Sequence, residues 1–222
     1  MRGSIRAELR SLLRQGEFML RRGLGFDHPR LLAESPNRLV VFVHGFLSHG
    51  SVWVPMREQI CKKHPVEAID FSYGFWEEFE RVAVRLAQKI EKHAQGRPIT
   101  LIGHSLGGLL ARWVIQEGWV EGADRLITLA TPHEGTRLAE WIPGPMAEAI
   151  RPGGAILRRL RALEGRLNRL ECWVIVAERD RLIQPLASAS ALARAQVLTF
   201  PVGHNELLFD REVLAFIAQH VG

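Results

Sequence analysis

The segment from Ile99 to Arg112 constrains the fold of this chain more than any other. An apolar run, Ile99–Ile102, ends in Gly103-His104-Ser105-Leu106-Gly107-Gly108, and a second apolar run follows. This change of pattern predicts a buried strand, a sharp turn and a helix. Glycines two residues before and two residues after Ser105 let the turn tighten and let neighbouring backbone approach. We expect Ser105 at the tip of the strand, beside the first amides of a helix, where negative charge is favoured.

A glycine-rich turn of this kind is also compatible with a loop that only packs well or that binds phosphate. A serine that transfers acyl groups needs a base, a carboxylate that orients the base, and donors for the developing oxyanion. Three other strand-like runs end beside suitable groups. The run Leu39–Val43 precedes His44-Gly45-Phe46, Cys172–Ala177 precedes Asp180, and Gln196–Phe200 precedes His204.

These motifs, taken in order, resemble the serine lipases and esterases of the α/β-hydrolase superfamily. The resemblance runs from about Leu39 to the C-terminus. It includes Leu129–Gly135, whose Thr-Pro-His sequence is similar to that of small bacterial triacylglycerol lipases and inositol-deacylase-like lipases. The order serine, acid, histidine is that of the superfamily. The predicted catalytic residues are Ser105, Asp180 and His204, with the backbone amides of Phe46 and Leu106 as oxyanion donors.

Two other carboxylates compete with Asp180 for the role of the acid. Glu134 lies beyond the strand that follows the serine, where some lipases of this fold place their acid, and Glu178 adjoins Asp180. Asp70 precedes the serine and would break the superfamily order. We therefore expect Asp180 to orient His204.

The resemblance implies hydrolysis of carboxylic esters through an acyl-enzyme intermediate, without a cofactor. An acyltransferase or a thioesterase with the same triad is the alternative enzyme, distinguished by the group that accepts the acyl chain. A ligand receptor without catalysis is a third interpretation, and the presence of all three triad residues argues against it.

Apolar residues around the predicted site favour a substrate with an acyl chain. Ordinary structural roles compete with substrate contact for several of them: the loop residue His44 could bind backbone, and the aromatic segment 71–79 could pack on the following helix. The predicted substrate-binding residues are His44, Leu47, Trp76, His133, Trp141 and Ile142.

The regular alternation of strand and helix patterns is interrupted between Gly135 and Asn168. This interruption predicts a cap or lid insertion over residues 135–168. Residues 135–154 are rich in proline and glycine and favour a cover over the site. Apolar residues then fall at helical spacing, with arginines on the other faces. This helix either covers the pocket and turns toward lipid, or packs on the sheet as an ordinary crossover. The apolar stripe consists of Ile156, Leu160, Leu163, Leu167 and Leu170.

Strand and helix patterns alternate along the chain. We therefore predict an α/β fold: one domain over residues 1–222, with a mostly parallel sheet of about six strands flanked by helices. Residues 23–38 are expected to be connection only. The remaining predicted strands are Val66–Ile69 and Arg125–Leu129, and the remaining helices are Ser51–Lys63, Trp76–Ala94, Pro185–Ala195 and Glu206–His220.

The N-terminal residues 1–22 are expected to contain an amphipathic helix, Ser4–Arg22, that packs on the sheet or lies on a membrane surface. Its charges and short apolar run argue against a signal peptide or a membrane span, which favours a cytoplasmic protein. If the helix lies on a membrane surface, the protein would also be membrane-peripheral. The net charge of +5 comes without a nucleic-acid motif, so we expect no nucleic-acid partner. Two separate cysteines and nine scattered histidines predict neither a disulfide framework nor a required metal.

Overall fold

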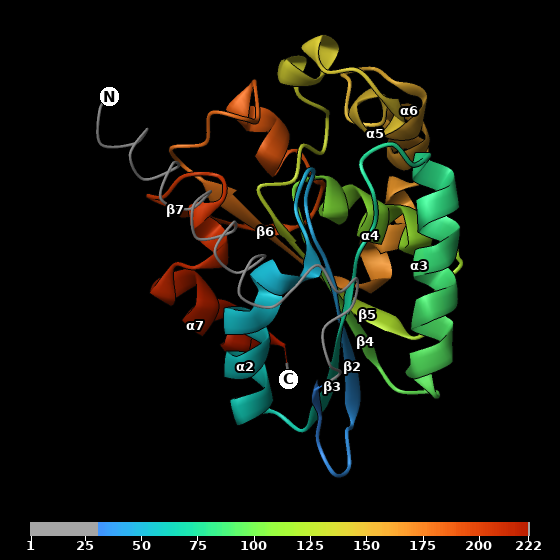
Figure 1. Ribbon diagram of the computed structural model, residues 1–222, viewed down its shortest axis with the longest axis vertical. Helices are drawn as coiled ribbons and strands as arrows, with labels where there is room; N and C mark the ends of the chain where they lie inside the picture. The colour runs from blue at the N-terminus through green and yellow to red at the C-terminus, as the bar shows by residue number, and fades with distance from the viewer. Residues whose placement is uncertain (1–30, 222) are drawn as a thin grey trace.

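The computed structural model describes residues 31–221, which form a layered α/β structure around one sheet (Figure 1). The sheet has seven strands in the order β1-β3-β2-β4-β5-β6-β7. β1 pairs with β3 in the antiparallel sense and all other neighbours are parallel. The strands are β1 (Leu31–Leu32), β2 (Arg38–Val43), β3 (Val66–Phe71), β4 (Ile99–His104), β5 (Ala123–Leu129), β6 (Glu171–Ala177) and β7 (Gln196–Phe200).

Helices cover both faces of the sheet, with α2 and α7 on one side and α3 and α4 on the other (Figure 1). The α-helices are α2 (Val54–Lys63), α3 (Phe79–Ala94), α4 (Leu106–Gln116), α5 (Pro145–Glu148), α6 (Ala155–Ala162) and α7 (Arg211–His220). Short 3-10 turns are η1 (Gly50–Trp53), η2 (Arg137–Trp141), η3 (Glu164–Arg169), η4 (Leu186–Ser190) and η5 (Glu206–Leu208).

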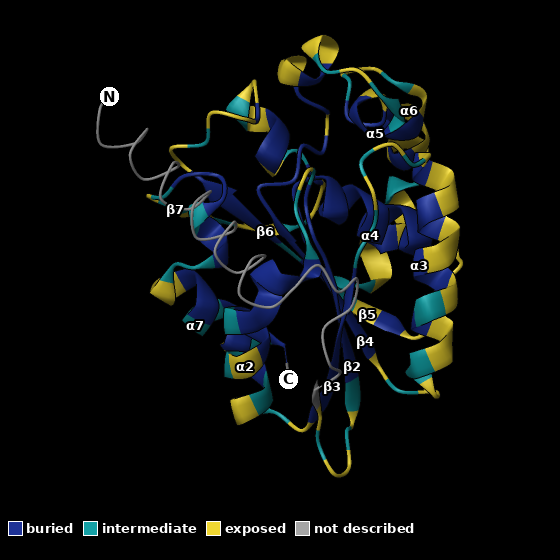
Figure 2. Cartoon of the chain, viewed as in Figure 1, coloured by how far each residue is buried: buried dark blue, intermediate teal, exposed yellow. Residues whose placement is uncertain are grey.

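Alternation along β2 shows how the sheet divides the core in two. Leu39, Val41 and Val43 pack in the cluster formed with α3 and α4, whereas Val40 and Phe42 pack in the cluster formed with α2 and α7. Successive side chains of a strand point to opposite faces, and here both faces are buried (Figure 2). Continuous apolar runs therefore signal central strands in this chain.

The predicted mostly parallel sheet flanked by helices is confirmed, and each of the six predicted strands is present. The prediction that residues 23–38 only connect is wrong at Leu31–Leu32, which add the short antiparallel edge strand β1. The helix predicted from Trp76 begins three residues later, at Phe79. The Trp76 ring instead packs edge-on against Phe75, with centroids 4.5 Å apart.

Two predicted C-terminal helices are also wrong in extent. The segment Pro185–Ala195 contains only the 3-10 turn η4, because the Ser188 hydroxyl donates to the Gly135 carbonyl at 2.7 Å and holds the turn against another loop. The helix predicted over Glu206–His220 is interrupted before α7. Asp210 caps α7, accepting hydrogen bonds from two of its first amides at 2.9 and 3.2 Å.

The apolar stripe of residues 155–170 faces the core. Ile156, Leu160 and Leu167 are buried in the cluster that contains α3 and α4, and the Gln116 side chain of α4 donates to the Leu160 carbonyl at 2.7 Å. The stripe is divided between α6 and η3 rather than carried by one helix. These contacts favour the interpretation of an ordinary crossover for this part of the insertion.

The amphipathic helix predicted within residues 1–22 lies outside the described residues. Over residues 31–221, we find no helix with the length and apolar character that a membrane crossing requires. Both cysteines, Cys61 and Cys172, have free thiols.

Candidate active site

Ser105 occupies the turn between β4 and α4 in a backbone conformation that side chains rarely adopt, with φ 53° and ψ −124°. Its amide donates to the Leu129 carbonyl of β5 at 2.8 Å, which fixes the turn at the carboxyl edge of the sheet. A Cβ atom at Gly107 would lie 2.2 Å from the Val43 carbonyl oxygen, so only glycine lets α4 approach β2 this closely. The predicted strand, turn and helix are present at this position.

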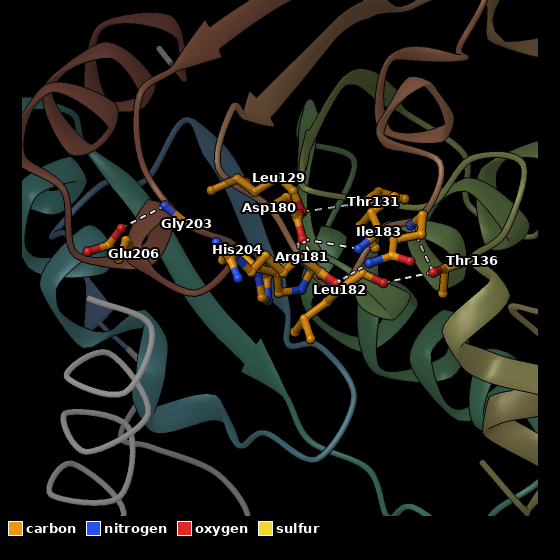
Figure 3. Close-up of polar contacts among 12 residues, drawn as sticks. Leu129, Thr131, Thr136, Asp180, Arg181, Leu182, Ile183, Gly203, His204 and Glu206 are labelled. Carbon is orange, nitrogen blue, oxygen red and sulfur yellow. Dashed lines mark hydrogen bonds and ion pairs between the residues drawn. The ribbon is translucent and has the colours of Figure 1, made fainter. Parts of the chain in front are cut away.

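Asp180 and His204 meet at the same edge, although 24 residues separate them in the sequence. The Nδ1 atom of His204 lies 2.7 Å from Oδ2 of Asp180 (Figure 3). Both side chains are almost fully buried. The other carboxylate oxygen, Oδ1, accepts from the amides of Leu182 and Ile183 at 2.8 and 3.1 Å. The carboxylate is thus held in one orientation toward the imidazole.

The environment keeps the Asp180 carboxylate ionised. Burial alone would raise its pKa, but the attraction and the hydrogen bond of His204, together with the two loop amides, hold the pKa below its usual value. An ionised Asp180 accepts the Nδ1 proton of His204, so Nε2 is left unprotonated in the neutral imidazole. That nitrogen can act as a base.

His104, the residue before Ser105, places His204 next to the Ser105 turn. The ring of His104 lies 4.7 Å from the ring of His204, centroid to centroid, and its Nε2 atom lies 3.1 Å from the His204 carbonyl oxygen. Gly45 adjoins the same turn, because a Cβ atom placed there would be 3.1 Å from Cβ of Ser105. The loops after β2, β4 and β7 therefore converge on Ser105.

His44 and Tyr73 brace the loop that carries Phe46. The His44 ring donates from Nδ1 to the Gly45 carbonyl at 2.8 Å, and its Nε2 accepts from the Tyr73 amide at 3.2 Å. The Tyr73 hydroxyl donates to the His44 carbonyl at 2.7 Å, and the two rings stack. Burial lowers the pKa of His44 to about 4, so the ring stays neutral and keeps these hydrogen bonds near neutral pH. His44 is buried and occupied by backbone, rather than open to a substrate.

Leu106 follows Ser105 directly, and Phe46 follows Gly45, which adjoins the Ser105 turn. Leu106 is the first residue of α4, and the first amides of a helix have no partner within the helix. Across residues 31–221, neither the Leu106 amide nor the Phe46 amide donates to another part of the backbone.

Aromatic rings connect the Phe46 loop to Gly144, which lies in the segment predicted to be an insertion. The rings of Phe46 and Phe75 pack edge-on with centroids 4.9 Å apart, and Phe75 packs in turn on Trp76. The Trp76 ring lies against Gly144, where a Cβ atom would be 3.1 Å away. Among the predicted substrate residues, Trp76, Leu47 and Trp141 are 68%, 70% and 84% exposed, and Ile142 is half-buried.

His133, a predicted substrate-binding residue, is hydrogen-bonded through both ring nitrogens to other side chains. Its Nδ1 accepts from the buried Arg112 guanidinium at 3.0 Å and its Nε2 donates to the Thr128 hydroxyl at 3.1 Å. Burial and the neighbouring Arg112 lower the pKa of His133 well below its usual value. Both ring nitrogens are therefore occupied by the protein, and the residue lines a cavity of about 120 Å³ with Arg112, Glu134 and Arg161.

The two alternative acids do not share the buried position of Asp180. Glu134 has a side chain 54% exposed, and its carboxylate lies 3.4 Å from the Arg161 guanidinium. Glu178 is exposed at the end of β6. The carboxylate that contacts His204 is that of Asp180.

Three residues that support the site escaped the sequence analysis: Tyr73, His104 and Thr136. Tyr73 follows β3, which is next to β2, so the neighbouring strand ends could have indicated it. His104 adjoins Ser105 in sequence, but the sequence alone did not show that its side chain is buried. Thr136 braces the loop after Asp180, a contact between loops that no local pattern indicates.

No group of three or more His, Cys, Asp or Glu side chains within the described residues is arranged to hold a metal ion. The groups that the structure brings together at this edge are a serine turn and an imidazole held by a carboxylate.

Comparison with known proteins shows which family and fold the chain shares. The chain is 34% identical over 107 residues to a pimeloyl-[acyl-carrier protein] methyl ester esterase from Aliivibrio salmonicida (strain LFI1238). That match covers 45% of this chain and only 37% of the esterase, so the chain matches little more than a third of its relative's length.

Solved structures of similar fold include lipases. The propeptide form of a Bacillus licheniformis lipase superposes with a TM-score of 0.70 at 19% identity, covering 87% of this chain and 54% of the lipase. A monoacylglycerol lipase from Paleococcus ferrophilus has a TM-score of 0.63 at 15% identity, covering 87% and 96%. These similarities establish the α/β-hydrolase fold.

One family model matches residues 33–144, a range that contains Phe46 and Ser105 and ends before Asp180 and His204. The match spans half of the chain. The chain therefore belongs to the family described as "Putative serine esterase (DUF676)".

Proposed function

We propose that this protein is a carboxylic ester hydrolase in which Ser105 is the nucleophile, His204 the base and Asp180 the residue that orients the base. The observation that carries the proposal is the buried 2.7 Å contact between His204 Nδ1 and Asp180 Oδ2. This contact leaves Nε2 as the basic nitrogen beside the turn that presents Ser105. Family membership supports the same chemistry.

In this mechanism, His204 Nε2 takes the hydroxyl proton as Ser105 Oγ attacks the ester carbonyl carbon. The tetrahedral intermediate collapses, the bond to the alcohol oxygen breaks, and the imidazolium returns its proton to the leaving alcohol. Water then attacks the acyl-enzyme, with its proton passing to His204 and on to Ser105 as the carboxylic acid departs. Asp180 stays ionised throughout and stabilises the transient imidazolium.

The amides of Phe46 and Leu106 are the proposed oxyanion donors. Each donor of this kind lowers the barrier by about 3–4 kcal/mol, because it is already oriented toward the charge that develops on the carbonyl oxygen. The His44 and Tyr73 hydrogen bonds hold the Phe46 loop in place, which makes the donor rigid. His44 then serves the loop rather than the substrate.

We further propose that the substrate carries an apolar acyl chain and is reached at a lipid surface. The support is the group of exposed apolar side chains on the Phe46 loop and on segments linked to it by the Phe75 and Trp76 rings. Leu47 and Trp141 belong to this group, and tryptophan is favoured at the boundary between lipid and water. Residues 135–154 would then act as the cap over the acyl chain.

The proposal is tested by labelling and turnover. A fluorophosphonate probe should modify Ser105, as identified by mass spectrometry of the labelled peptide, and Ser105→Ala should abolish both labelling and turnover of p-nitrophenyl butyrate. Ser190→Ala is the matched control, because this serine is exposed and its hydroxyl donates to the nearby Ala187 carbonyl. Unchanged turnover in Ser105→Ala would eliminate the mechanism.

Two further measurements define the substrate class: the length of the acyl chain that is cleaved and the molecule that accepts the acyl group. We expect p-nitrophenyl palmitate or emulsified triglyceride to be cleaved along with butyrate, with water as the acyl acceptor. Transfer of the acyl group to an added alcohol in preference to water would instead identify an acyltransferase, and a marked preference for thioesters would identify a thioesterase.

A further inference from the structure

The His104 imidazole is a buried polar group that the mechanism above does not use. It belongs to the last residue of β4 and is 2% exposed. Its Nε2 atom lies 3.1 Å from the His204 carbonyl oxygen. A carbonyl oxygen only accepts hydrogen bonds, so Nε2 carries the proton and Nδ1 has a bare lone pair.

That Nδ1 atom has no hydrogen-bond partner within residues 31–221. It faces Gly45 of the Phe46 loop, where an added Cβ atom would be only 2.8 Å from it. The His104 ring therefore sits between two loops of the site, contacting Gly45 on one side and His204 on the other.

An unpaired buried nitrogen costs stability, and a methionine or phenylalanine at this position would not incur that cost. The tautomer that donates to the His204 carbonyl is also the one that leaves Nδ1 unpaired. Burial, and then the neighbouring His204, lowers the pKa of His104 to about 3, so the ring remains a neutral donor at the pH of ester hydrolysis. The hydrogen bond from His104 Nε2 to the His204 carbonyl is thus made while His104 Nδ1 has no partner within residues 31–221.

We propose that His104 is a positioning residue for the base, holding the backbone of His204 at a fixed distance from Ser105. This inference rests on the proposed function of Ser105 and His204. Asp180 fixes the ring of His204 through Nδ1, and His104 fixes its main chain. Because His104 precedes Ser105 directly, the loop after β7 cannot shift relative to the nucleophile while this hydrogen bond is intact.

Two nearly isosteric substitutions separate the hydrogen bond from the volume of the side chain. Glutamine in His104→Gln can place an amide N–H near the position of Nε2, whereas His104→Met has similar length and no donor. We expect His104→Met to lower kcat about 10- to 100-fold with KM changed less than about threefold, because small misplacements of reacting groups are this costly. His104→Gln should recover most of the lost kcat.

His64→Phe is the matched control. His64 makes the same kind of contact, from Nε2 to the Ala218 carbonyl at 2.7 Å, but between α2 and α7. Its loss should lower the melting temperature and leave kcat unchanged. A residue that only stabilises the fold would behave in this way, and His104 should not.

A spectroscopic measurement on the intact protein tests the inference independently of enzymatic activity. The proton shared by His204 Nδ1 and Asp180 should give a downfield ¹H NMR signal that persists in His104→Gln and broadens or disappears in His104→Met. Because this signal does not need Ser105, it can be recorded in the Ser105→Ala background. Retained turnover in Ser105→Ala would remove the proposed function, and the signal would still report on His104.

Three outcomes would overturn the inference. They are wild-type kcat in His104→Met, equal loss of kcat in the Gln and Met variants, or a downfield signal that is the same in both. Should His104→Met fail to fold, His104→Phe keeps the bulk of the ring without a donor, and the same comparison with His104→Gln decides.

Discussion

Thr136 is hydrogen-bonded to Leu182, two residues beyond Asp180: its hydroxyl donates to the Leu182 carbonyl at 2.7 Å. The same oxygen accepts from the Gln184 amide at 3.0 Å. Thr136 belongs to residues 135–168, the segment predicted to be an insertion, and its own amide donates to the Ile150 carbonyl at 2.9 Å. This segment thus contributes to the orientation of the proposed acid.

Removal of the Thr136 hydroxyl should loosen the Asp180 loop. We expect Thr136→Val to lower the free energy of unfolding by about 1–3 kcal/mol, because a carbonyl and an amide lose their partner. We also expect kcat to fall about tenfold through displacement of Asp180. Thr136→Ser retains the hydroxyl and should stay close to wild type in urea denaturation and in turnover, so equal behaviour of the two variants would contradict this account.

Replacement of the acid should distinguish Asp180 from Glu134. Asp180→Asn keeps the size of the side chain but offers His204 the wrong tautomeric partner, so we expect kcat to fall by about 10³–10⁴-fold. Glu134→Gln removes an exposed ion pair with Arg161 and should change kcat by less than about twofold. Similar mild losses in both variants would leave neither carboxylate as the acid.

The nucleophile turn depends on the absence of a side chain at Gly107. Its added Cβ would lie 2.2 Å from the Val43 carbonyl oxygen, and the backbone atoms there cannot yield cheaply. We expect Gly107→Ala to lower the free energy of unfolding by about 2–3 kcal/mol or more, and to slow fluorophosphonate labelling of Ser105. Gly165→Ala is the matched control, since nothing lies within 4 Å of a Cβ there; equal effects would refute the steric account.

Lipid contact should depend on the exposed apolar side chains near the site. We expect Trp141→Ala to weaken sedimentation with anionic phosphatidylglycerol vesicles about tenfold, because much of a tryptophan side chain would return to water. Trp119 is 41% exposed in the connection that precedes β5, at the amino edge of the sheet. Trp119→Ala should therefore bind vesicles as the wild type does, and an equal loss would point to non-specific adsorption.

The sequence predicted those parts of the site that follow from strand ends. Asp180 and His204 come directly after apolar strands, and parallel strands bring their carboxyl ends to one edge, so their meeting needed no knowledge of the loops. Ser105 lies in a local motif whose glycines specify the turn. The physical basis in each case is periodicity or backbone geometry within a few residues.

Contacts between loops could not be predicted in the same way. Thr136 reaches Leu182 over 46 residues of sequence, and no local pattern pairs them. The Thr-Pro-His motif suggested that His133 binds substrate. In the structure, its ring nitrogen Nδ1 instead accepts a hydrogen bond from Arg112, a buried residue of α4. The segment Pro185–Ala195 looked helical by composition, yet the tertiary hydrogen bond from Ser188 to Gly135 reduces it to a single 3-10 turn.

Buried histidines should make the protein sensitive to acid: His44 and His104 are two of them, and His133 acts in the same direction because its pKa is also lowered. The pKa is lowered to about 4 for His44 and to about 3 for His104, whereas an unfolded histidine has a pKa of about 6.5. Between these values the unfolded state binds more protons, so lowering the pH favours unfolding. We expect each residue to reduce the free energy of unfolding by about 1–2 kcal/mol at pH 5 relative to pH 7.5. Asp180, with a pKa below its usual value, loses its contribution to stability only at lower pH.

Urea denaturation at pH 7.5 and at pH 5 measures the decrease in the free energy of unfolding. This decrease should be smaller in His44→Gln than in the wild type. A wild-type unfolding free energy that is the same at both pH values would contradict the argument.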